Sequence, residues 1–330
     1  MSIKLPTVSV CCITYNHEAY LAQAIESVLM QQTDFDVEMV IGEDCSSDNT
    51  RAIAQEYERR YPGRVRVLVH PQNLGIMRNL MATRVACQGE FIAFLEGDDY
   101  WIDDTKLQRQ VDALMSTTGC AMCFHDAELL YEASIDTSNG TASERVTSFS
   151  ERFPHILPKA ETNTASITFT QLDLARLGWF IPSASMLFRA SSLPLPLPAW
   201  FAGVFSGDFT LQLLSTNSGA AMYLPRKMAV YRLHPGGVMH TLHNNLIQNE
   251  RRIWEAEHYC RNFNSSLVPY FIPYLEHLYF ERSVKLGAKG QRVQQFYYYV
   301  KAISISPQRF SDHLKRLTQR VTGRMRFPKN

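Results

Sequence analysis

The chain has 330 residues, of which 45% are hydrophobic and 20% charged, a composition typical of a folded globular protein and not of a disordered one. The net charge of +1, averaged over the whole chain, favours no class of partner. No run of residues approaches the roughly 20 apolar positions of a membrane-spanning helix. Met1–Pro6 leads directly into a strand pattern and shows no secretory signal.

The seven cysteines favour a reducing compartment. Their number is odd, and Cys11, Cys12 and Cys87 lie within apolar runs, which is typical of reduced thiols packed in a core. Cys120 and Cys123 have the spacing of redox and zinc motifs, but they fall in a predicted strand, where positions three apart point to opposite faces. We therefore expect this pair to be packed in the core and the protein to be cytoplasmic.

Strand and helix patterns alternate regularly through the first part of the chain. Short apolar, β-rich runs predict strands at residues 8–14, 37–42, 65–69, 91–95 and 119–130. Apolar residues at helical spacing lie between these runs, and Ser46 or Ser47 is expected to cap the second helix. This order predicts an α/β fold with a mostly parallel sheet flanked by helices, in which ligands bind at the carboxyl ends of the strands.

The second part of the chain has weaker patterns. Residues 133–164 are polar and rich in Ser and Thr, which predicts a long loop or lid. Strands are expected at 183–189 and 223–234, and a helix is expected to begin at Gly207. Residues 241–330 have helical spacing and many aromatic residues.

Three carboxylates follow the apolar run 91–95 in the sequence Glu96-Gly97-Asp98-Asp99. Carboxylates this close repel one another and gain nothing from burial. A hard divalent cation, bound by oxygen ligands and shared with phosphate oxygens, would compensate them. The alternative is an ordinary loop or capped helix start, which a pair of aspartates often forms.

Five segments with their order and spacing resemble the family 2 glycosyltransferases of bacterial cell-surface polysaccharide synthesis, which have the GT-A fold. The matching segments are residues 10–16 (VCCITYN), 42–50 (GEDCSSDNT), 73–75 (NLG), 89–95 (GEFIAFL) and 96–99 (EGDD). The resemblance is firm over the first third, patchy to about residue 240 and absent beyond it. It implies a GT-A domain at 1–240, with a nucleotide-binding half (1–125) and an acceptor half (126–240), followed by a helical, basic extension at 241–330.

The resemblance also implies a reaction. A sugar would pass from a nucleotide-diphosphate donor, with UDP preferred, to a hydroxyl of a glycan or lipid-linked acceptor, with inversion and with Mn²⁺ or Mg²⁺ as the cofactor. The metal would be held by Asp99, with His234 of the Tyr231–Gly237 segment completing its shell or touching the diphosphate. For His234 a hydrogen-bonded turn residue is the alternative, and His240 and His243 are other candidate ligands.

The nucleotide-binding residues implied by the resemblance lie at the ends of the predicted strands. They are Thr14, Tyr15, Asn16, Glu43, Asp44, Arg78 and Asp98. Asp44 matches the carboxylate that accepts a hydrogen bond from the pyrimidine, and Glu43 stands where an Asp is more usual. Asp44 and Asn16 also have an alternative interpretation as helix caps.

Asp208 is the candidate catalytic base. Inverting transfer needs a carboxylate that takes the proton of the attacking hydroxyl, and the resemblance implies one at the start of a helix in the acceptor half. A plain N-cap is the alternative for Asp208. Asp126 and Asp173 are weaker candidates for the same role.

The C-terminal part is strongly basic. From Arg282 onward the chain has twelve Lys and Arg residues and a single acid, Asp312. Such a segment can lie on an anionic membrane face, which would suit a lipid-linked acceptor at the inner face of the membrane. The alternative is a solvated helical cap on the main domain. Nucleic acid is not an expected partner, because no binding motif accompanies the charge.

Two other functions compete with sugar transfer. One is a non-catalytic module that binds a nucleotide sugar. The other is a nucleotidyltransferase or dinucleotide enzyme on a similar sheet, and the absence of GxGxxG after the first strand argues against its dinucleotide version.

Overall fold

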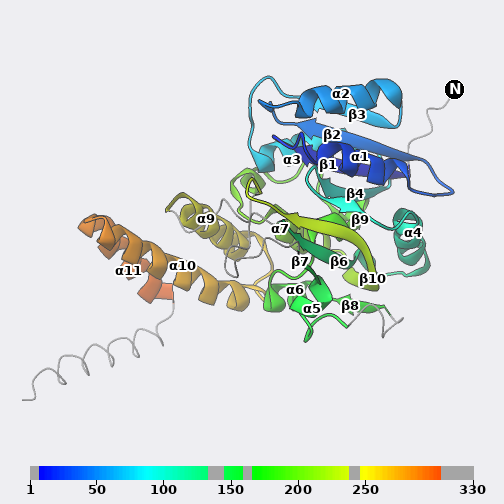
Figure 1. The fold of residues 1–330 in the computed structure, drawn as a ribbon. Helices are drawn as coiled ribbons and strands as arrows, with labels where there is room; N and C mark the ends of the chain where they lie inside the picture. Colours follow the sequence, from blue (N-terminus) through cyan, green and yellow to red (C-terminus); the bar gives the residue numbers. More distant parts are fainter. Residues whose placement is uncertain (1–6, 133–144, 159–165, 238–245, 306–330) are drawn as a thin grey trace, which may run out of the picture. The chain divides into compact units, whose positions relative to one another are not determined.

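The computed structural model describes residues 7–132, 145–158, 166–237 and 246–305 (Figure 1). The chain forms two compact units. The first consists of Met1–Ala202 and Ser206–His243, and the second of Gly203–Phe205 and Asn244–Asn330. The predicted ligands His240 and His243 and the basic residues beyond 305 lie outside the described residues.

A sheet of ten strands forms the centre of the first unit. Its order is β3-β2-β1-β4-β9-β6-β10-β5, with β7 paired to β6 and β8 paired to β10. The strands are β1 (Val8–Thr14), β2 (Val37–Glu43), β3 (Val65–Val69), β4 (Phe91–Glu96), β5 (Tyr100–Trp101), β6 (Cys120–Tyr131), β7 (Arg145–Ser148), β8 (Ile167–Phe169), β9 (Leu187–Arg189) and β10 (Ala220–Leu233). The strands predicted at 8–14, 37–42, 65–69, 91–95, 119–130 and 223–234 are confirmed.

The sheet is parallel in its first half and mixed in its second. The strands β3, β2, β1 and β4 run parallel to one another, as predicted, and β6 is parallel to β10. The strand β9 lies antiparallel between β4 and β6 and joins the two halves. Only the last part of the strand predicted at 183–189 forms, because Ser183–Ser185 makes a 3₁₀ turn, η1.

Helices cover this sheet and connect its strands. They are α1 (Leu21–Leu29), α2 (Thr50–Arg60), α3 (Ile76–Ala86), α4 (Lys106–Ser116), α5 (Phe149–Arg152), α6 (Gln171–Leu177) and α7 (Gly207–Ser215), with short 3₁₀ turns η2 (Ala190–Ser192) and η3 (Ala199–Gly203). The expected cap at Ser46 or Ser47 is wrong: α2 begins at Thr50, whose N–H donates to the Asp48 carboxylate. The predicted loop at 133–164 contains β7 and α5, and residues 133–144 and 159–164 lie outside the described residues.

Pairing between β10 and β5 brings a distant part of the chain to the end of β4. Val230 pairs with Tyr100 and Ala229 with Trp101, in antiparallel register. The residues after β10, including His234, therefore lie beside the Glu96–Asp99 segment. This pairing positions the candidate site.

The second unit is helical, as the sequence predicts for its end. It contains α9 (Leu246–Asn262), α10 (Val268–Ala288) and α11 (Arg292–Ile305). Their common core is formed by Ile253, Ala256, Leu275, Leu278, Tyr279 and Ala302. Among the described helices, none is both long enough and apolar enough to cross a membrane.

Candidate active site

The polar segments at the ends of β1, β2 and β4 are neighbours because of the sheet register. Ile13 on β1 pairs with Glu96 on β4, and Thr14 pairs with Glu43 on β2. The backbone N–H of Gly97 continues this pairing by donating to the carbonyl of Ile13 at 2.9 Å. The carboxylates after β4 thus lie at the carboxyl edge of a parallel sheet, where open α/β folds bind ligands.

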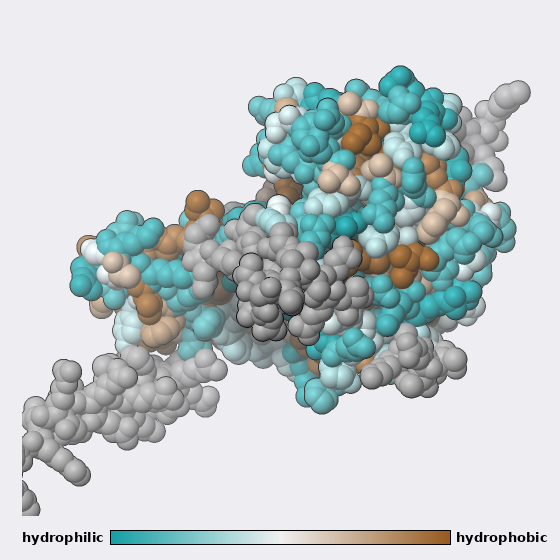
Figure 2. Space-filling view, in the orientation of Figure 1, coloured by the Kyte–Doolittle hydropathy of each residue, from teal (hydrophilic) through white to brown (hydrophobic). Residues whose placement is uncertain are grey.

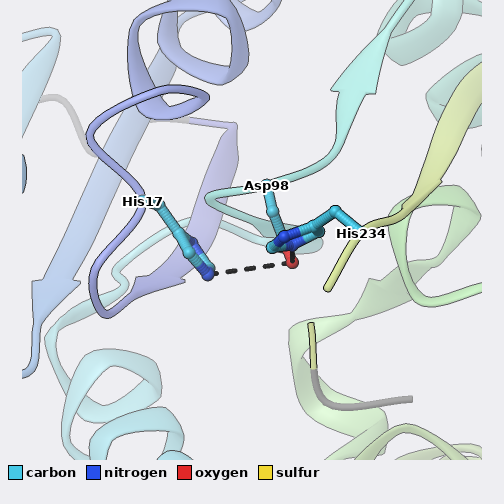
Figure 3. Close-up of side chains that lie close together, drawn as sticks. All are labelled: His17, Asp98 and His234. Atoms are coloured by element: carbon cyan, nitrogen blue, oxygen red, sulfur yellow. Dashed lines mark hydrogen bonds and ion pairs between the residues drawn. The ribbon is translucent and has the colours of Figure 1, made fainter. Parts of the chain in front are cut away.

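His17, Asp98 and His234 form a cluster at this edge. They follow β1, β4 and β10 in the chain, and Figure 3 shows their side chains pointing toward one another. His234 Nε2 lies 3.0 Å from Asp98 Oδ2, and His17 Nε2 lies 3.7 Å from the same oxygen. One ligand atom of each residue lies within 4.8 Å of the other two, so the three could hold one metal ion.

The protonation states in the cluster suit metal binding. Burial by itself would raise the pKa of Asp98, but the hydrogen bond from His234 and the charges of His17 and His234 lower it overall. Burial lowers the pKa of His17, with a further contribution from His234 and against the attraction of Asp98 and Asp48. An ionised carboxylate beside a neutral imidazole is the form in which these side chains bind metals.

Asp99 is turned away from the cluster toward β10. Its Oδ1 accepts a hydrogen bond from the backbone N–H of Arg232 at 2.8 Å, and its buried Oδ2 has no hydrogen-bond partner. Burial, together with the charges of Asp98 and Glu96, raises the pKa of Asp99 well above its usual range. The sequence predicts Asp99 and His234 as metal ligands, whereas the structure places Asp98 beside His234. The role of Asp99 as a ligand stays a prediction.

Arg232 fixes the carboxylate turn in place. Its Nε donates to the backbone carbonyl of Asp98 at 2.9 Å, and its guanidinium also reaches Gln23 and Glu132. The same group lies over the ring of Tyr20, 4.7 Å from the centroid. The arginine therefore neutralises none of the three carboxylates through a direct ion pair, and Asp98 stays available to a cation.

Unsatisfied polar atoms surround the turn. Among the described residues, Thr14 Oγ1, His17 Nδ1 and Asp99 Oδ2 are buried without a hydrogen-bond partner. Buried polar atoms of native proteins are rarely left in this state, and a bound ion is one of the usual reasons. The donors present, a carboxylate and imidazoles with an orphaned carboxylate oxygen nearby, fit a divalent cation.

Gly97 lets the turn approach β1 closely. A Cβ at this position would lie 2.6 Å from Thr14 Oγ1 and 2.9 Å from His17 Nδ1. The φ angle of Gly97 is not positive, so its backbone conformation does not require glycine. Glycine is needed here because a side chain would not fit beside Thr14 and His17.

The Gly97→Ala substitution is expected to lower the free energy of unfolding by about 1–3 kcal/mol through overpacking. It should also weaken Mn²⁺ binding, because the methyl group would displace His17 or Thr14. Thermal unfolding and a Mn²⁺ titration measure the two effects. Gly63→Ala is the matched control: with φ at 82° and no atom near its Cβ, it strains the chain without touching the cluster. Mn²⁺ affinity as high in Gly97→Ala as in that control would contradict the proposed site.

Asp208 and Glu96 line one pocket beside the cluster. The lining of this pocket is mostly apolar and includes Met77, Leu80, Met186 and Leu211. Trp179 Nε1 donates to Asp208 Oδ2 at 2.6 Å, and Ser183 Oγ donates to Glu96 Oε2 at 2.9 Å. Burial raises the pKa of Asp208, and burial with the charges of Asp98 and Asp208 raises the pKa of Glu96 to about 8.

The three candidate bases, Asp208, Asp126 and Asp173, differ in their contacts. Ser206 and not Asp208 is the N-cap of α7, so the N-cap interpretation of Asp208 is wrong. Asp126 is buried and accepts hydrogen bonds from Ser150 and from the N–H of Ala127. Asp173 forms the capping box of α6 with Thr170. Of the three, Asp208 is the one that lines the pocket.

Glu43 holds the loop that follows β2, and Asp44 holds the loop that follows β3. The Asp44 carboxylate accepts hydrogen bonds from the N–H groups of Leu74 and Gly75, at 2.7 and 2.9 Å. Asp44 does not cap α2, because Asn49 occupies the N-cap position. Glu43 accepts from the N–H of Ser46 and forms an ion pair with Arg51 at 2.7 Å. Burial opposes ionisation of Glu43, but Ser46 and Arg51 together lower its pKa. Contact of either residue with a nucleotide stays a prediction.

The other predicted nucleotide contacts lie around the same loops. Asn16, at a φ of +56°, accepts a hydrogen bond from the N–H of Ser47 and so joins the loop after β1 to the loop after β2. It is not a helix cap, because Tyr20 occupies that position in α1. Tyr15 is exposed, and Arg78 is exposed in the first turn of α3, so both are accessible to a ligand.

A match to a protein-family model identifies the family of this chain. The model of glycosyl transferase family 2 matches residues 9–174, just over half of the chain. The chain belongs to this family. The resemblance noted in the sequence is thereby confirmed.

Curated relatives of this glycosyltransferase come from bacteria. An uncharacterized protein of Mycobacterium tuberculosis is 31% identical over 248 residues, which are 75% of this chain and 64% of the relative. TuaG of Bacillus subtilis, a glycosyltransferase named for teichuronic acid biosynthesis, is 38% identical over 127 residues, which are 38% of this chain and 48% of TuaG. The chain therefore spans only part of the length of these relatives.

A solved structure shares the fold of the glycosyltransferase. It is S. aureus TarS, residues 1–349 in complex with UDP-GlcNAc, with a TM-score of 0.57 and 16% identity. The match covers 92% of this chain and 82% of that one. The likeness supports the GT-A fold expected from the sequence.

Three residues of the site were missed by sequence reasoning. His17 directly follows the Thr14–Asn16 segment of the family motif, so its position was a usable signal. Trp179 and Ser183, which hold Asp208 and Glu96, lie in a region where the resemblance is patchy. No local pattern in the sequence distinguishes them.

Proposed function

We propose that this chain is a cation-dependent, inverting glycosyltransferase that uses a UDP-sugar donor and a hydroxyl acceptor. The observation that carries the proposal is the placement of the Asp98 carboxylate with two imidazoles next to a pocket that the carboxylate of Asp208 lines. Asp98 with the two imidazoles suits a cation that binds the diphosphate, and Asp208 suits removal of the proton from the acceptor. In this proposal residues 1–125 bind the nucleotide and residues 126–240 receive the acceptor.

The proposed cation ligands are Asp98, His17 and His234. The buried Oδ2 of Asp99, which has no hydrogen-bond partner, is a further candidate ligand. A cation bound there would neutralise the charge that develops on the departing diphosphate. The imidazoles favour Mn²⁺ over Mg²⁺, since nitrogen donors bind later first-row metals more tightly. Arg232 keeps the turn in shape through the carbonyl of Asp98 and leaves its carboxylate free.

Asp208 is the proposed base. Trp179 Nε1 donates a hydrogen bond to Asp208 Oδ2 and so holds the carboxylate in the pocket that would receive the hydroxyl of the acceptor. As the acceptor oxygen attacks the anomeric carbon, the bond from that carbon to the diphosphate oxygen breaks and Asp208 takes the hydroxyl proton. Attack from the face opposite the leaving group inverts the anomeric centre.

The donor and acceptor classes rest on the site and on the relatives. Exposed Tyr15 and Arg78 are proposed to contact the base and the diphosphate, together with Thr14, Asn16, Glu43 and Asp44. TarS, which shares the fold, binds UDP-GlcNAc, and TuaG is named for a polysaccharide pathway. We infer a glycan or lipid-linked acceptor in surface polysaccharide synthesis. All seven cysteines are free, in keeping with the cytoplasmic location inferred from the sequence.

A donor screen tests the proposal. The full chain is incubated with UDP-, dTDP- and GDP-sugars, with Mn²⁺ or with EDTA, and released nucleoside diphosphate is measured. We expect release from a UDP-sugar with Mn²⁺ and a loss of at least about tenfold in EDTA. Equal release in EDTA would refute the cation dependence. Tight donor binding without release, with or without acceptor glycans, would favour the non-catalytic binding module.

A further inference from the structure

The helix α11 has two apolar faces. On its inner face, Ala302 belongs to the core of the second unit, and Tyr298 and Ile305 pack against that core. On its other face lie Val293, Phe296, Tyr297 and Val300, which are 85%, 68%, 53% and 39% exposed. Their spacing of three, four and seven residues places these four side chains in one stripe along the helix. We call them the outer stripe.

An outer stripe of this kind is not needed for folding. A helix on the surface of a globular unit buries one apolar face and presents a polar one to solvent. The neighbouring helix α10 adds the exposed side chains of Phe280 and Val284. Figure 2 accordingly shows brown, hydrophobic residues at the surface of the α10 and α11 region. Contiguous exposed apolar side chains on one face indicate a binding surface.

The charge around the outer stripe indicates what it binds. The exposed Lys289 and Arg292 stand at its start. Lys301, at its other end, forms an ion pair with Glu257 and lies over the ring of Tyr297. After α11 the sequence continues with seven Lys and Arg residues and one acid between 306 and 330. An apolar stripe with aromatic residues, flanked by positive charge, matches an anionic lipid surface.

We propose that the outer stripe of α11 enters the headgroup region of an anionic bilayer. Val293, Phe296 and Val300 leave water there, and Tyr297 has the amphipathic ring that favours this interface. The exposed side chains of Lys289 and Arg292 bind lipid phosphates. The sequence predicts membrane contact through the basic segment from Arg282 onward. Its part beyond residue 305 lies outside the described residues, and the stripe is a described surface within the rest. This surface is separate from the proposed reaction site and does not depend on it.

Vesicle flotation of the full chain tests the proposal. Vesicles of equal parts phosphatidylglycerol and phosphatidylcholine are compared with vesicles of phosphatidylcholine alone. We expect binding to the first, with a fall at high salt, and little binding to the second. Phe296→Gln combined with Tyr297→Gln is expected to lower the partition coefficient by about tenfold or more, because apolar burial drives the insertion.

Met115→Gln is the matched control, since Met115 on α4 is 66% exposed and lies in the first unit. It should bind vesicles like the wild type. Circular dichroism and Mn²⁺-dependent donor hydrolysis, unchanged in both variants, show that the fold and the reaction site are intact. Wild-type binding by the double variant would overturn the proposal. So would equal binding to both vesicle types, or an effect of the variant only on self-association in solution, which would assign the stripe to a second copy of the chain.

Discussion

Asp98→Asn is expected to lower Mn²⁺-dependent sugar transfer by about a hundredfold to a thousandfold, since a metal that stabilises a departing anion contributes several kcal/mol. The amide keeps the size of the side chain but removes the charge that both imidazoles face at 3.0 and 3.7 Å. Mn²⁺ affinity, measured by electron paramagnetic resonance titration, should fall together with kcat/KM. Thermal unfolding should change little, because the amide has the size of the carboxylate and can still accept the hydrogen bond from His234.

Asp99→Asn separates the two assignments of the metal ligand. Its amide oxygen can still accept the N–H of Arg232, as the carboxylate does at 2.8 Å. If Asp98 is the ligand, this variant retains most of the Mn²⁺ affinity. If instead Asp99→Asn abolishes binding while Asp98→Asn preserves it, the ligand assigned from the sequence motif is correct and the cluster with His17 is not the metal site.

The sequence was sufficient to predict the edge of the sheet at which the site lies. Each apolar run that became β1, β2 or β4 is followed by polar residues, and in a parallel sheet these ends must meet. The pairing of Ile13 with Glu96 and of Thr14 with Glu43 confirms this reasoning. It depends only on the period of the strands and on their direction, which are local properties.

The approach of His234 to Asp98 could not be predicted in the same way. It depends on the antiparallel pairing of β10 with the two-residue strand β5, a contact between segments more than 120 residues apart. A short strand has no periodicity to identify it. The motif alone therefore predicted that a carboxylate and an imidazole would share a metal, but not which of two adjacent carboxylates faces the imidazole.

The hydrogen bond that holds Asp208 could not be predicted from the sequence either. Its position at the start of α7 was predicted from Gly207 and the following apolar spacing. Its hydrogen bond from Trp179 arises from a segment 29 residues earlier, between α6 and η1. Whether an aspartate in the first turn of a helix caps it or faces a pocket depends on the helix's exact first residue, which sequence patterns locate poorly.

Asp208→Asn is expected to lower kcat by about a hundredfold to ten-thousandfold, the contribution of a positioned general base. The amide still accepts the hydrogen bond from Trp179 through its oxygen, so the pocket should keep its shape. Affinity for Mn²⁺ and for the donor should be unchanged. Asp173→Asn is the control, because Asp173 caps α6 and lies outside the pocket; that variant should lose stability and retain kcat.

The pH dependence of the reaction provides a second test of Asp208. Burial raises its pKa above the value of an ordinary aspartate, about 3.9. A base works when deprotonated, so kcat/KM should be highest above this raised pKa and fall as the pH decreases through it. In Asp208→Asn, whose residual rate needs no deprotonated carboxylate at that position, this acid limb should disappear.

Glu96 shares the pocket and has a pKa raised to about 8. An acid limb that persists in Asp208→Asn and disappears in Glu96→Gln would therefore transfer the role of the base to Glu96.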